Sequence, residues 1–555
     1  MSDTQTYASK RSARGKTGGT GIFAFASWAI ALACLLPMIA VAIAALTGGT
    51  DTVASLMNTV MPRYAGTTIA LVAMVAAGTL AIGVGAAWFV TMTRFPGVRF
   101  FEVALVLPLA FPGYVLAYAY TFVLDHPGIV QTTLRDVTGW GPRDYWFPEV
   151  RSVGGAAVML VLVLYPYVYL LARAAFLQQS AGAFLAARAL GKSSFEAFWK
   201  VSLPMARPAI ASGVLLAIME TIADFGTVAY FGVQTFATGI YTSWFSMADR
   251  AAAAQLALVL LGFALTLAVL ERTTRGAARY HQAGKQATRM PPADLKGVHR
   301  VLAWGLCAIP VLLGFLLPVI ILFDMGLESE QNLFSKRYVG FLQNSVMLAA
   351  VAACVTVCAA VLIGFYLRVR PGRPAASAAY AARLGYAVPG GVIAVGLMVP
   401  FAAFDNALDA WMRATFDIST GLLVTGSIWL LVAAYMVRFL AAALGAYEGG
   451  LSTVHSNMDA AARSLGQSPI GMLRRVHLPI VTPSLLTALL IVFVDVMKEL
   501  PATLIMRPFN FDTLAVQAYR LASDERLEGA AVPSLVIVAV GLLPVILICR
   551  QVGRR

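Results

Sequence analysis

Two apolar stretches of this 555-residue chain contain ionisable side chains spaced to share one side of a helix. The stretch LLAIMETIADFGTVAYFG contains Glu220 and Asp224, and LLIVFVDVMKELPATLIM contains Asp495, Lys498 and Glu499. Positions three and four residues apart lie on one helical face. A charge at mid-membrane costs about 2.5–3.5 kcal/mol, so these side chains are expected to face a bundle interior or a wet pathway. Four carboxylates and one lysine give a net negative lining, which suits a cationic solute and offers the oxygen ligands of a hard cation.

An offset of 275 residues relates the two sets. It aligns Glu220 with Asp495, and Asp224 with Glu499. A structural interpretation also stays open: Asp495 and Lys498 pair with each other, and the other carboxylates lie near the ends of their spans.

The cysteines and histidines predict no second chemical site. All five cysteines fall within apolar runs, where they neither build a soluble zinc site nor staple an exposed domain: Cys34, Cys307, Cys354, Cys358 and Cys549. Cys354 and Cys358 share a helical face and could ligate a soft metal, although small-residue helix packing is the commoner use. The five histidines are scattered over loops and form no ligand cluster.

The same offset relates two copies of a longer pattern, LAARALGKSSFEAFWKVSLPMARP at 185–208 and AAARSLGQSPIGMLRRVHLPIVTP at 460–483. The chain is therefore an internal duplication. Each copy predicts a helix ended by glycine, a short amphipathic helix, and a proline in the first turn of the next span. The matched positions are Ala186, Ala187, Gly191, Val201, Leu203 and Pro204, and Ala461, Ala462, Gly466, Val476, Leu478 and Pro479.

Both copies resemble the cytoplasmic coupling loop of ABC import permeases, whose pattern is Glu-Ala-Ala, then Gly, then Ile-x-Leu-Pro. The resemblance implies that each copy docks into a cleft on an ATPase subunit. Leu185 and Ala460 stand where the family has glutamate, and both copies have valine in place of isoleucine. Glu196 and Asp459 are nearby carboxylates that could replace the missing one.

The composition is that of a polytopic membrane protein: 59% hydrophobic residues, 12% charged residues and a mean hydropathy of +0.77. The net charge of +14 does not indicate nucleic-acid binding, because the basic residues lie mostly in short loops beside apolar runs. We predict an all-α polytopic fold of about twelve transmembrane helices in two parallel six-helix repeats. The expected spans are about 23–46, 66–92, 100–124, 153–176, 206–231 and 250–270, then 301–323, 342–367, 377–403, 420–445, 481–506 and 529–549.

The predicted organisation begins with a disordered cytoplasmic tail, 1–20. The first repeat follows at 21–271, with its core at about 62–271, and a cytoplasmic linker at 272–300 leads to the second repeat at 301–550, with its core at about 338–549. The first apolar run is too long for the core of a signal peptide and is expected to be retained. Most Lys and Arg residues fall on the side that holds both termini, which predicts that both ends are cytoplasmic, in the inner membrane.

The run KELPATLIMRPFNFDTLAVQAYRLASDERLEGAA, at 498–531, resembles permeases of ferric-iron ABC importers. The first half echoes it weakly at Phe236, Thr238 and Asp249. Related fused permeases carry thiamine, polyamines or aminoethylphosphonate, and these substrates stay open.

The resemblance implies a transport permease without catalytic residues, cofactors or fixed metal ligands of its own. ATP and Mg would be bound by a partner ATPase, expected as a homodimer. The outer loops are too short for a capture domain, so a separate external binding protein would supply the substrate. An ion-driven secondary carrier is the alternative from another class, although TRFPGVR, at 93–99, lacks the loop signature typical of the major facilitator family.

Overall fold

A computed structural model describes the chain except for residues 1–20, 180, 279–292, 330, 332–334 and 554–555. The expected disordered tail and residues 279–292 of the expected linker lie outside the described residues. The chain divides into two compact units that do not coincide with its two sequence halves. The smaller unit comprises Met1–Leu36, Ala350–Tyr386 and Tyr435–Phe493, and the larger comprises Pro37–Ala349, Ala387–Ala434 and Val494–Arg555.

The predicted all-α polytopic fold is confirmed. Eleven helices within the described residues are long and apolar enough to cross a membrane. The count reaches twelve if Val98–Ala110 and Gly113–Thr138, which meet at a bend of 92°, form one span. A short parallel pairing of β1 (Thr93–Arg94) with β2 (Ala293–Asp294) ties the end of the linker to the first half.

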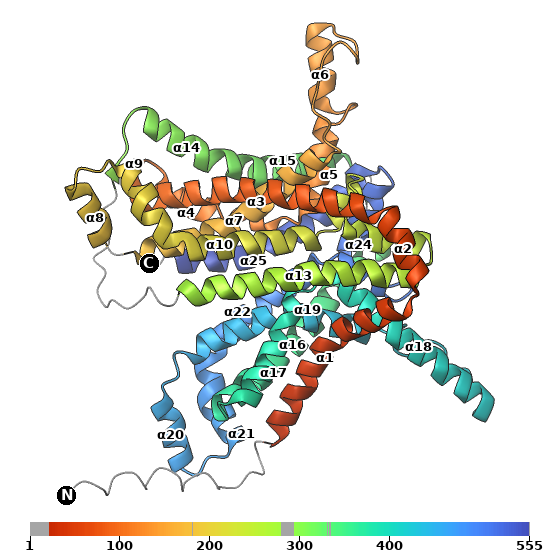
Figure 1. Ribbon diagram of the computed structural model, residues 1–555. Coiled ribbons are helices and arrows are strands. Elements are labelled where there is room, and N and C mark those ends of the chain that lie inside the picture. The colour runs from red at the N-terminus through yellow and green to blue at the C-terminus, as the bar shows by residue number, and fades with distance from the viewer. Residues whose placement is uncertain (1–20, 180, 279–292, 330, 332–334, 554–555) are drawn as a thin grey trace, which may run out of the picture. The chain divides into compact units, whose positions relative to one another are not determined.

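Most helices belong to the larger unit (Figure 1). Those of the first half are α2 (Thr50–Asn58), α3 (Met61–Met92), α4 (Val98–Ala104), η1 (Leu107–Ala110), α5 (Gly113–Leu124), α6 (Ile129–Thr138), α7 (Val153–Gln178), α8 (Ala181–Ala189), α9 (Ser194–Ala197), η2 (Phe198–Ser202), α10 (Leu203–Ala223), α11 (Gly226–Tyr230), α12 (Phe236–Tyr241), η3 (Thr242–Ser246) and α13 (Arg250–Ala278). Those of the second half are α14 (Val298–Val311), η5 (Leu312–Leu316), α15 (Leu317–Glu328), α18 (Gly390–Phe416), α23 (Pro501–Met506), α24 (Leu514–Ser523) and α25 (Leu527–Gly553).

The smaller unit is built from second-half segments and the start of the first span. It contains α17 (Arg373–Leu384), α20 (Ser456–Ser464), α21 (Pro469–Met472) and η7 (Leu473–His477), and η6 (Gly385–Ala387) lies at its boundary. Four long helices contribute to both units: α1 (Gly21–Thr47), α16 (Lys336–Val369), α19 (Ile428–Leu451) and α22 (Leu478–Met497).

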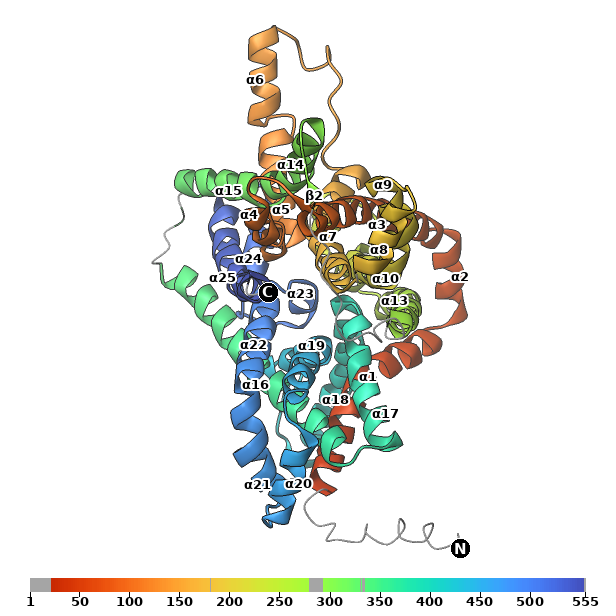
Figure 2. The same ribbon diagram turned by 90° about the vertical axis from the view of Figure 1, so that its left-hand side faces the viewer.

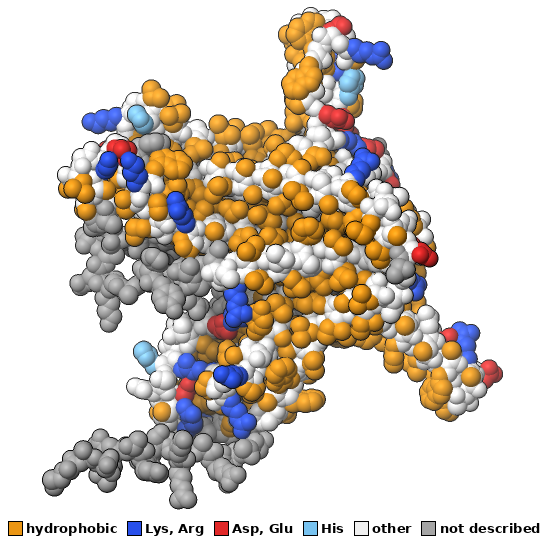
Figure 3. Space-filling model, in the orientation of Figure 1, with side chains coloured by type: hydrophobic (Ala, Val, Ile, Leu, Met, Phe, Trp, Pro, Cys, Tyr) orange, Lys and Arg blue, Asp and Glu red, His pale blue; other side chains and the backbone are white. Residues whose placement is uncertain are grey.

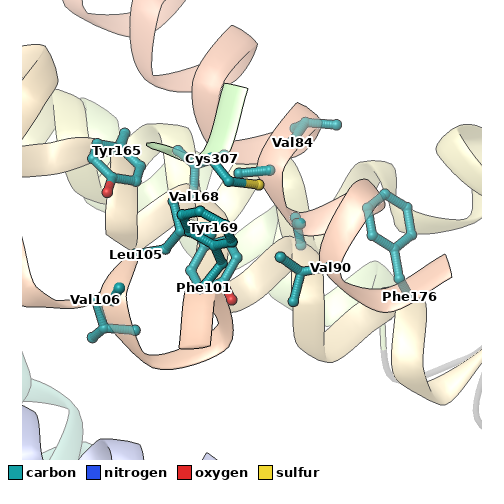
Figure 4. Packing of buried hydrophobic residues seen from close by; sticks show 14 of the residues in the cluster. Val84, Val90, Phe101, Leu105, Val106, Tyr165, Val168, Tyr169, Phe176 and Cys307 are labelled. Carbon is teal, nitrogen blue, oxygen red and sulfur yellow. The ribbon is translucent and has the colours of Figure 1, made fainter. Parts of the chain in front are cut away.

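The core of the first half forms where α3, α4 and α7 pack together. Phe101, Tyr165, Val168 and Tyr169 are buried within it (Figure 4). Gly83 lets α3 approach α7 closely, because a Cβ built on Gly83 would lie 2.7 Å from the Cβ of Val168. Contact through small residues is typical of helix packing in membranes. This contact fixes α7, which leads directly into α8 and the first copy of the repeated pattern.

We expect Gly83→Val to destabilise the protein, because the added side chain must push α3 away from α7. Overpacking of this kind costs about 1–3 kcal/mol. Gly66→Val is the matched control, since Gly66 lies on the same helix and has no neighbouring atom within 4 Å of its Cβ position. Thermal unfolding of the purified protein should show a lower Tm for Gly83→Val than for Gly66→Val. Equal values would contradict the close packing of α3 on α7.

Candidate functional site

The fifth span of each half is broken at its predicted carboxylates. In the first half α10 ends at Ala223, and the short helix α11 begins at Gly226. In the second half α22 ends at Met497, and α23 begins at Pro501. The prediction of one continuous helix through 206–231 and through 481–506 is therefore wrong.

Asp224 follows the end of α10 and caps the next helix. Its carboxylate accepts hydrogen bonds from Thr227 N at 3.1 Å, Val228 N at 3.2 Å and Thr227 Oγ1 at 3.0 Å. The first N–H groups of a helix have no partner within the helix, and side-chain oxygens commonly satisfy them. Because Asp224 is no longer on α10, it does not share a helical face with Glu220 as expected.

Glu499 has the same role in the second half. Its carboxylate accepts hydrogen bonds from Ala502 N at 2.8 Å, Thr503 N at 3.1 Å and Thr503 Oγ1 at 2.7 Å. Glu499 is buried. The duplication has thus preserved a helix cap, and these contacts support the structural interpretation for both capping carboxylates.

Glu220, Asp495 and Lys498 are placed differently from the caps. Lys498 Nζ lies 2.9 Å from Asp495 Oδ1, and each side chain is about 30% exposed. This ion pair is the one that the structural interpretation expected, and it offsets the negative charge of Asp495. Glu220 is half-buried on α10, one turn before the break. The role of all three residues in a substrate pathway remains a prediction.

A cavity of about 480 Å³ adjoins the break within the larger unit. Its walls carry aromatic rings, hydroxyl groups and one amide, and no charged side chain: Tyr64, Phe225, Ala229, Gly232, Val233, Gln234, Thr238, Tyr241, Thr242, Phe245, Ser246, Leu504 and Tyr519. Both halves contribute, and Ala229 and Leu504 are equivalent positions at the 275-residue offset. Phe225 stacks on Tyr241 with ring centroids 3.7 Å apart, and the Tyr519 ring lies 5.7 Å from that of Phe225.

This cavity was not predicted, because aromatic and hydroxyl residues are common in apolar spans. The only local indication was the position of Phe225, directly after the carboxylate that breaks the span. The arrangement can bind a small molecule through ring faces and neutral hydrogen-bonding groups.

The glycine-closed helix predicted for each repeated pattern is confirmed, but the short helix that follows it is not separate, because it runs without a break into the next span. Gly191 and Gly466 have φ angles of +81° and +73°, which glycine adopts without strain. Each glycine closes a helix in the same way: Lys192 N donates to Ala187 O at 3.1 Å, and Gln467 N donates to Ala462 O at 3.0 Å. Pro204 and Pro479 are the second residues of α10 and α22. The role of these segments in coupling is not tested by this geometry.

The second copy is anchored by a buried ionic contact within the smaller unit. The Asp459 carboxylate, on α20, lies 2.7 Å from Arg368 Nε and 2.7 Å from His477 Nε2. Burial raises the pKa of Asp459, but hydrogen bonds from His477 and Arg368 outweigh it and hold the pKa below its ordinary value. The Asp459 carboxylate is therefore occupied by Arg368 and His477, and these contacts hold α20 within the smaller unit.

The first copy is held by aromatic packing instead. Phe184, on α8, occupies the position equivalent to Asp459 at the 275-residue offset. Trp88 lies 6.1 Å from Phe184, 4.2 Å from Phe198 and 5.7 Å from Phe176, measured between ring centroids. The two copies share a helix cap but are attached to their bundles by different chemistry.

Glu196 is also engaged locally. It accepts a hydrogen bond from Ser193 N at 3.2 Å and lies 3.3 Å from Lys200 Nζ. The Ser193 N–H and the Lys200 ammonium lower the pKa of the exposed Glu196 carboxyl. Both carboxylates considered as replacements for the missing glutamate thus have partners in this chain.

The described residues contain no group of three or more His, Cys, Asp or Glu side chains that could hold a metal ion. Cys354 and Cys358 are free and exposed on α16, whereas Cys34 and Cys307 are free and buried. Cys549 lies where side chains are not described.

Two segments of the chain, residues 79–272 and 357–555, match the family described as "Binding-protein-dependent transport system inner membrane component". The chain belongs to this family of permeases. The two matches confirm the duplication, and each includes one of the broken spans and one copy of the repeated pattern.

Relatives of this permease align over most of its length. It is 27% identical over 530 residues to the Fe(3+)-transport system permease protein FbpB 2 of Haemophilus influenzae, covering 94% of this chain and 96% of the relative. It is 26% identical over 571 residues to the "Probable ABC transporter permease protein y4fN" of Sinorhizobium fredii, covering 95% of each. It is 23% identical over 461 residues to the ferric transport system permease protein FbpB of Actinobacillus pleuropneumoniae, covering 80% of this chain and 64% of the relative.

We expect Asp459→Asn to loosen α20, because the amide cannot replace a charge that binds Arg368 and His477. Hydrogen bonds to charged groups contribute about 1.5–3 kcal/mol each, so a clear loss of stability should follow. Glu196→Gln is the matched control in the first copy, where an exposed ion pair contributes about 0–1 kcal/mol. Limited proteolysis of the purified permease should cut Asp459→Asn faster within 452–468 and should leave Glu196→Gln unchanged. Equal cleavage of Asp459→Asn and the unmodified protein would refute the anchor.

Proposed function

We propose that this chain is the membrane permease of an ATP-driven ABC importer and that it moves ferric iron across the inner membrane. The observation that carries the proposal is the pair of repeated segments, each with the same glycine-closed helix followed by a span that begins with Leu-Pro. Two repeated segments 275 residues apart suit a partner that has two equivalent docking sites, one for each segment. The FbpB relatives and the run at 498–531 support iron as the substrate.

In the proposed cycle the chain performs no bond chemistry. A cytoplasmic ATPase, taken as a homodimer, binds ATP and Mg and closes. Closure draws the segments around Gly191 and Gly466 together and switches the pathway between inward-facing and outward-facing states. Both termini lie in the cytoplasm, and an external binding protein delivers the substrate to the opposite side.

The pathway is proposed to pass Glu220, the Asp495–Lys498 pair and the aromatic cavity. Asp224 and Glu499 contribute by keeping the broken spans in shape. This division of roles follows from their contacts, since both capping carboxylates bind backbone N–H groups of their own chain.

The cavity supports a second candidate substrate class, the small organic cations. A volume of about 480 Å³ is suited to a small organic molecule. Aromatic faces attract organic cations at short range. Thiamine and polyamines are substrates of this type, whereas aminoethylphosphonate also carries an anionic group that the cavity lining does not complement.

A secondary carrier would also have about twelve spans, but its intramembrane carboxylates would act as proton relays. Uptake into cells treated with an uncoupler while ATP is held constant separates the classes. The proposed importer continues to take up iron under these conditions, and a collapse of uptake would favour the carrier.

We expect Gly191→Val combined with Gly466→Val to reduce iron uptake about tenfold or more, because a left-handed backbone at a non-glycine residue costs about 1–2 kcal/mol. Neither glycine has a neighbouring atom within 4 Å of its Cβ position, so the effect acts through the shape of the two segments. Gly139→Val is the matched control, since Gly139 closes α6 with a φ of +71° and also has open surroundings. Unchanged uptake by the double variant would contradict the coupling role.

We expect Glu220→Gln to lower iron uptake severalfold, because it removes a pathway charge, and to lower Tm less than Glu499→Gln does, because the Glu220 side chain caps no helix. Glu499→Gln should lower both uptake and Tm, because its amide cannot accept all the hydrogen bonds that the carboxylate accepts from α23. Uptake and thermal unfolding are measured on the same preparations. Normal uptake by Glu220→Gln would remove this residue from the pathway.

A further inference from the structure

The segment 125–152 forms an arm that projects sideways from the larger unit. Figure 1 shows α6, at the top, standing across the direction in which α3 and α13 run. Figure 2, viewed from the end at which α8 and α9 lie, shows the same helix extending beyond the other helices of this unit. Since α3 and α13 are candidate membrane spans, a helix that stands across them is directed along the plane that a membrane around these spans would have.

The polar side of α6 is occupied by the returning chain. Arg135 Nη1 donates to Tyr145 Oη at 3.0 Å, and Tyr145 Oη donates to Gln131 Oε1 at 2.8 Å. Arg135 Nη2 also donates to the His126 carbonyl at 3.0 Å. These contacts fix which face of α6 is turned toward the rest of the arm.

The remaining face is apolar and exposed. Ile129, Val130 and Val137 lie on one side of α6 and are 63%, 39% and 80% exposed. On the returning segment, Trp140 and Trp146 are 48% and 85% exposed. Exposed side chains of this size on one helix face indicate a surface that contacts something other than water.

The second half also pairs a helix with a returning chain, but its faces do not match those of α6, because Asp405 aligns with Val130 and Trp411 with Asp136. Residues 404–413 of α18 align with 129–138 at the 275-residue offset. Asp405 Oδ2 accepts a hydrogen bond from Thr425 N at 2.8 Å, which binds the returning chain to the polar face. Phe404 and Trp411, on the helix, remain 53% and 56% exposed.

We propose that the apolar face of the 125–152 arm lies in the outer leaflet of the membrane, at the level of the lipid headgroups. Figure 3 shows hydrophobic side chains along the left side of the arm, toward the α8 end, and Arg and His side chains on its right side. The apolar side is thus turned toward the α8 end of the spans. The spans also have exposed apolar side chains, such as Val158 on α7. An amphipathic helix in the interface buries its apolar face in this way, and tryptophan is enriched at this level.

The arm thereby gains a fixed position on the membrane surface. Asp136 is exposed and lies seven residues after Ile129, at the edge of the apolar face, where its carboxylate can reach the outer water. The placement in the outer leaflet rests on the proposed orientation, with both termini in the cytoplasm, and not on the identity of the transported substrate.

Spin labels on the full-length protein in liposomes test the position of the arm. Val137→Cys and its neighbour Asp136→Cys are each labelled in a background in which the native cysteines are replaced by alanine. Collision with oxygen, which concentrates in lipid, is compared with collision with a water-soluble nickel chelate. We expect a severalfold higher oxygen-to-nickel ratio at 137 than at 136. Equal ratios, or greater nickel access at 137, would overturn the proposal and leave the face for a protein partner.

Trp146 supplies a measurement that needs no cysteine replacement. Brominated outer-leaflet lipids quench tryptophan fluorescence at short range, and we expect Trp146→Phe to lower the quenched fraction. If that fraction is the same in Trp146→Phe and the unmodified protein, Trp146 does not reach the lipid and the proposed placement fails.

Discussion

A membrane span that stops part-way must satisfy its backbone polar groups without help from water. This constraint acts at the same place in both halves of the permease, where α10 and α22 end before α11 and α23 begin. Asp224 and Glu499 meet it by accepting hydrogen bonds from the backbone of the short helices. The break turns the chain so that Phe225 and Leu504 reach the cavity wall. The lining of the proposed pathway therefore depends on two helix caps.

The duplication has preserved geometry more closely than chemistry. Gly191 and Gly466 close equivalent helices with the same backbone hydrogen bond, yet Phe184 and Asp459 attach those helices through aromatic packing and ionic contacts respectively. A symmetric ATPase pair would meet two surfaces of similar shape that differ in how they resist displacement. Aromatic packing tolerates small shifts, whereas a buried carboxylate between two partners is costly to move. The two halves are thus mechanically unequal.

The sequence predicted the features that repeat or that depend on hydropathy. The apolar runs, the offset of 275 residues and the glycine–proline pattern were enough to predict the all-α fold and the glycine-closed helix of both repeated segments. The breaks after Ala223 and Met497 were not foreseen, because the apolar runs continue beyond them for the length of a full span. The carboxylates were noticed as charges, but their use as caps depends on the positions of backbone N–H groups that spacing alone does not give. The cavity around Phe225 and Tyr519 joins residues far apart in the chain and required the tertiary structure.

ATPase activity of the reconstituted complex tests the central claim most directly. The permease is combined in liposomes with its cognate ATPase and with the external binding protein, either empty or loaded with ferric iron, thiamine or a polyamine. We expect the iron-loaded binding protein to stimulate ATP hydrolysis above the level seen with the empty one. Stimulation by an organic cation alone would contradict the iron assignment, and failure of the ATPase to associate with the permease would contradict the proposed importer.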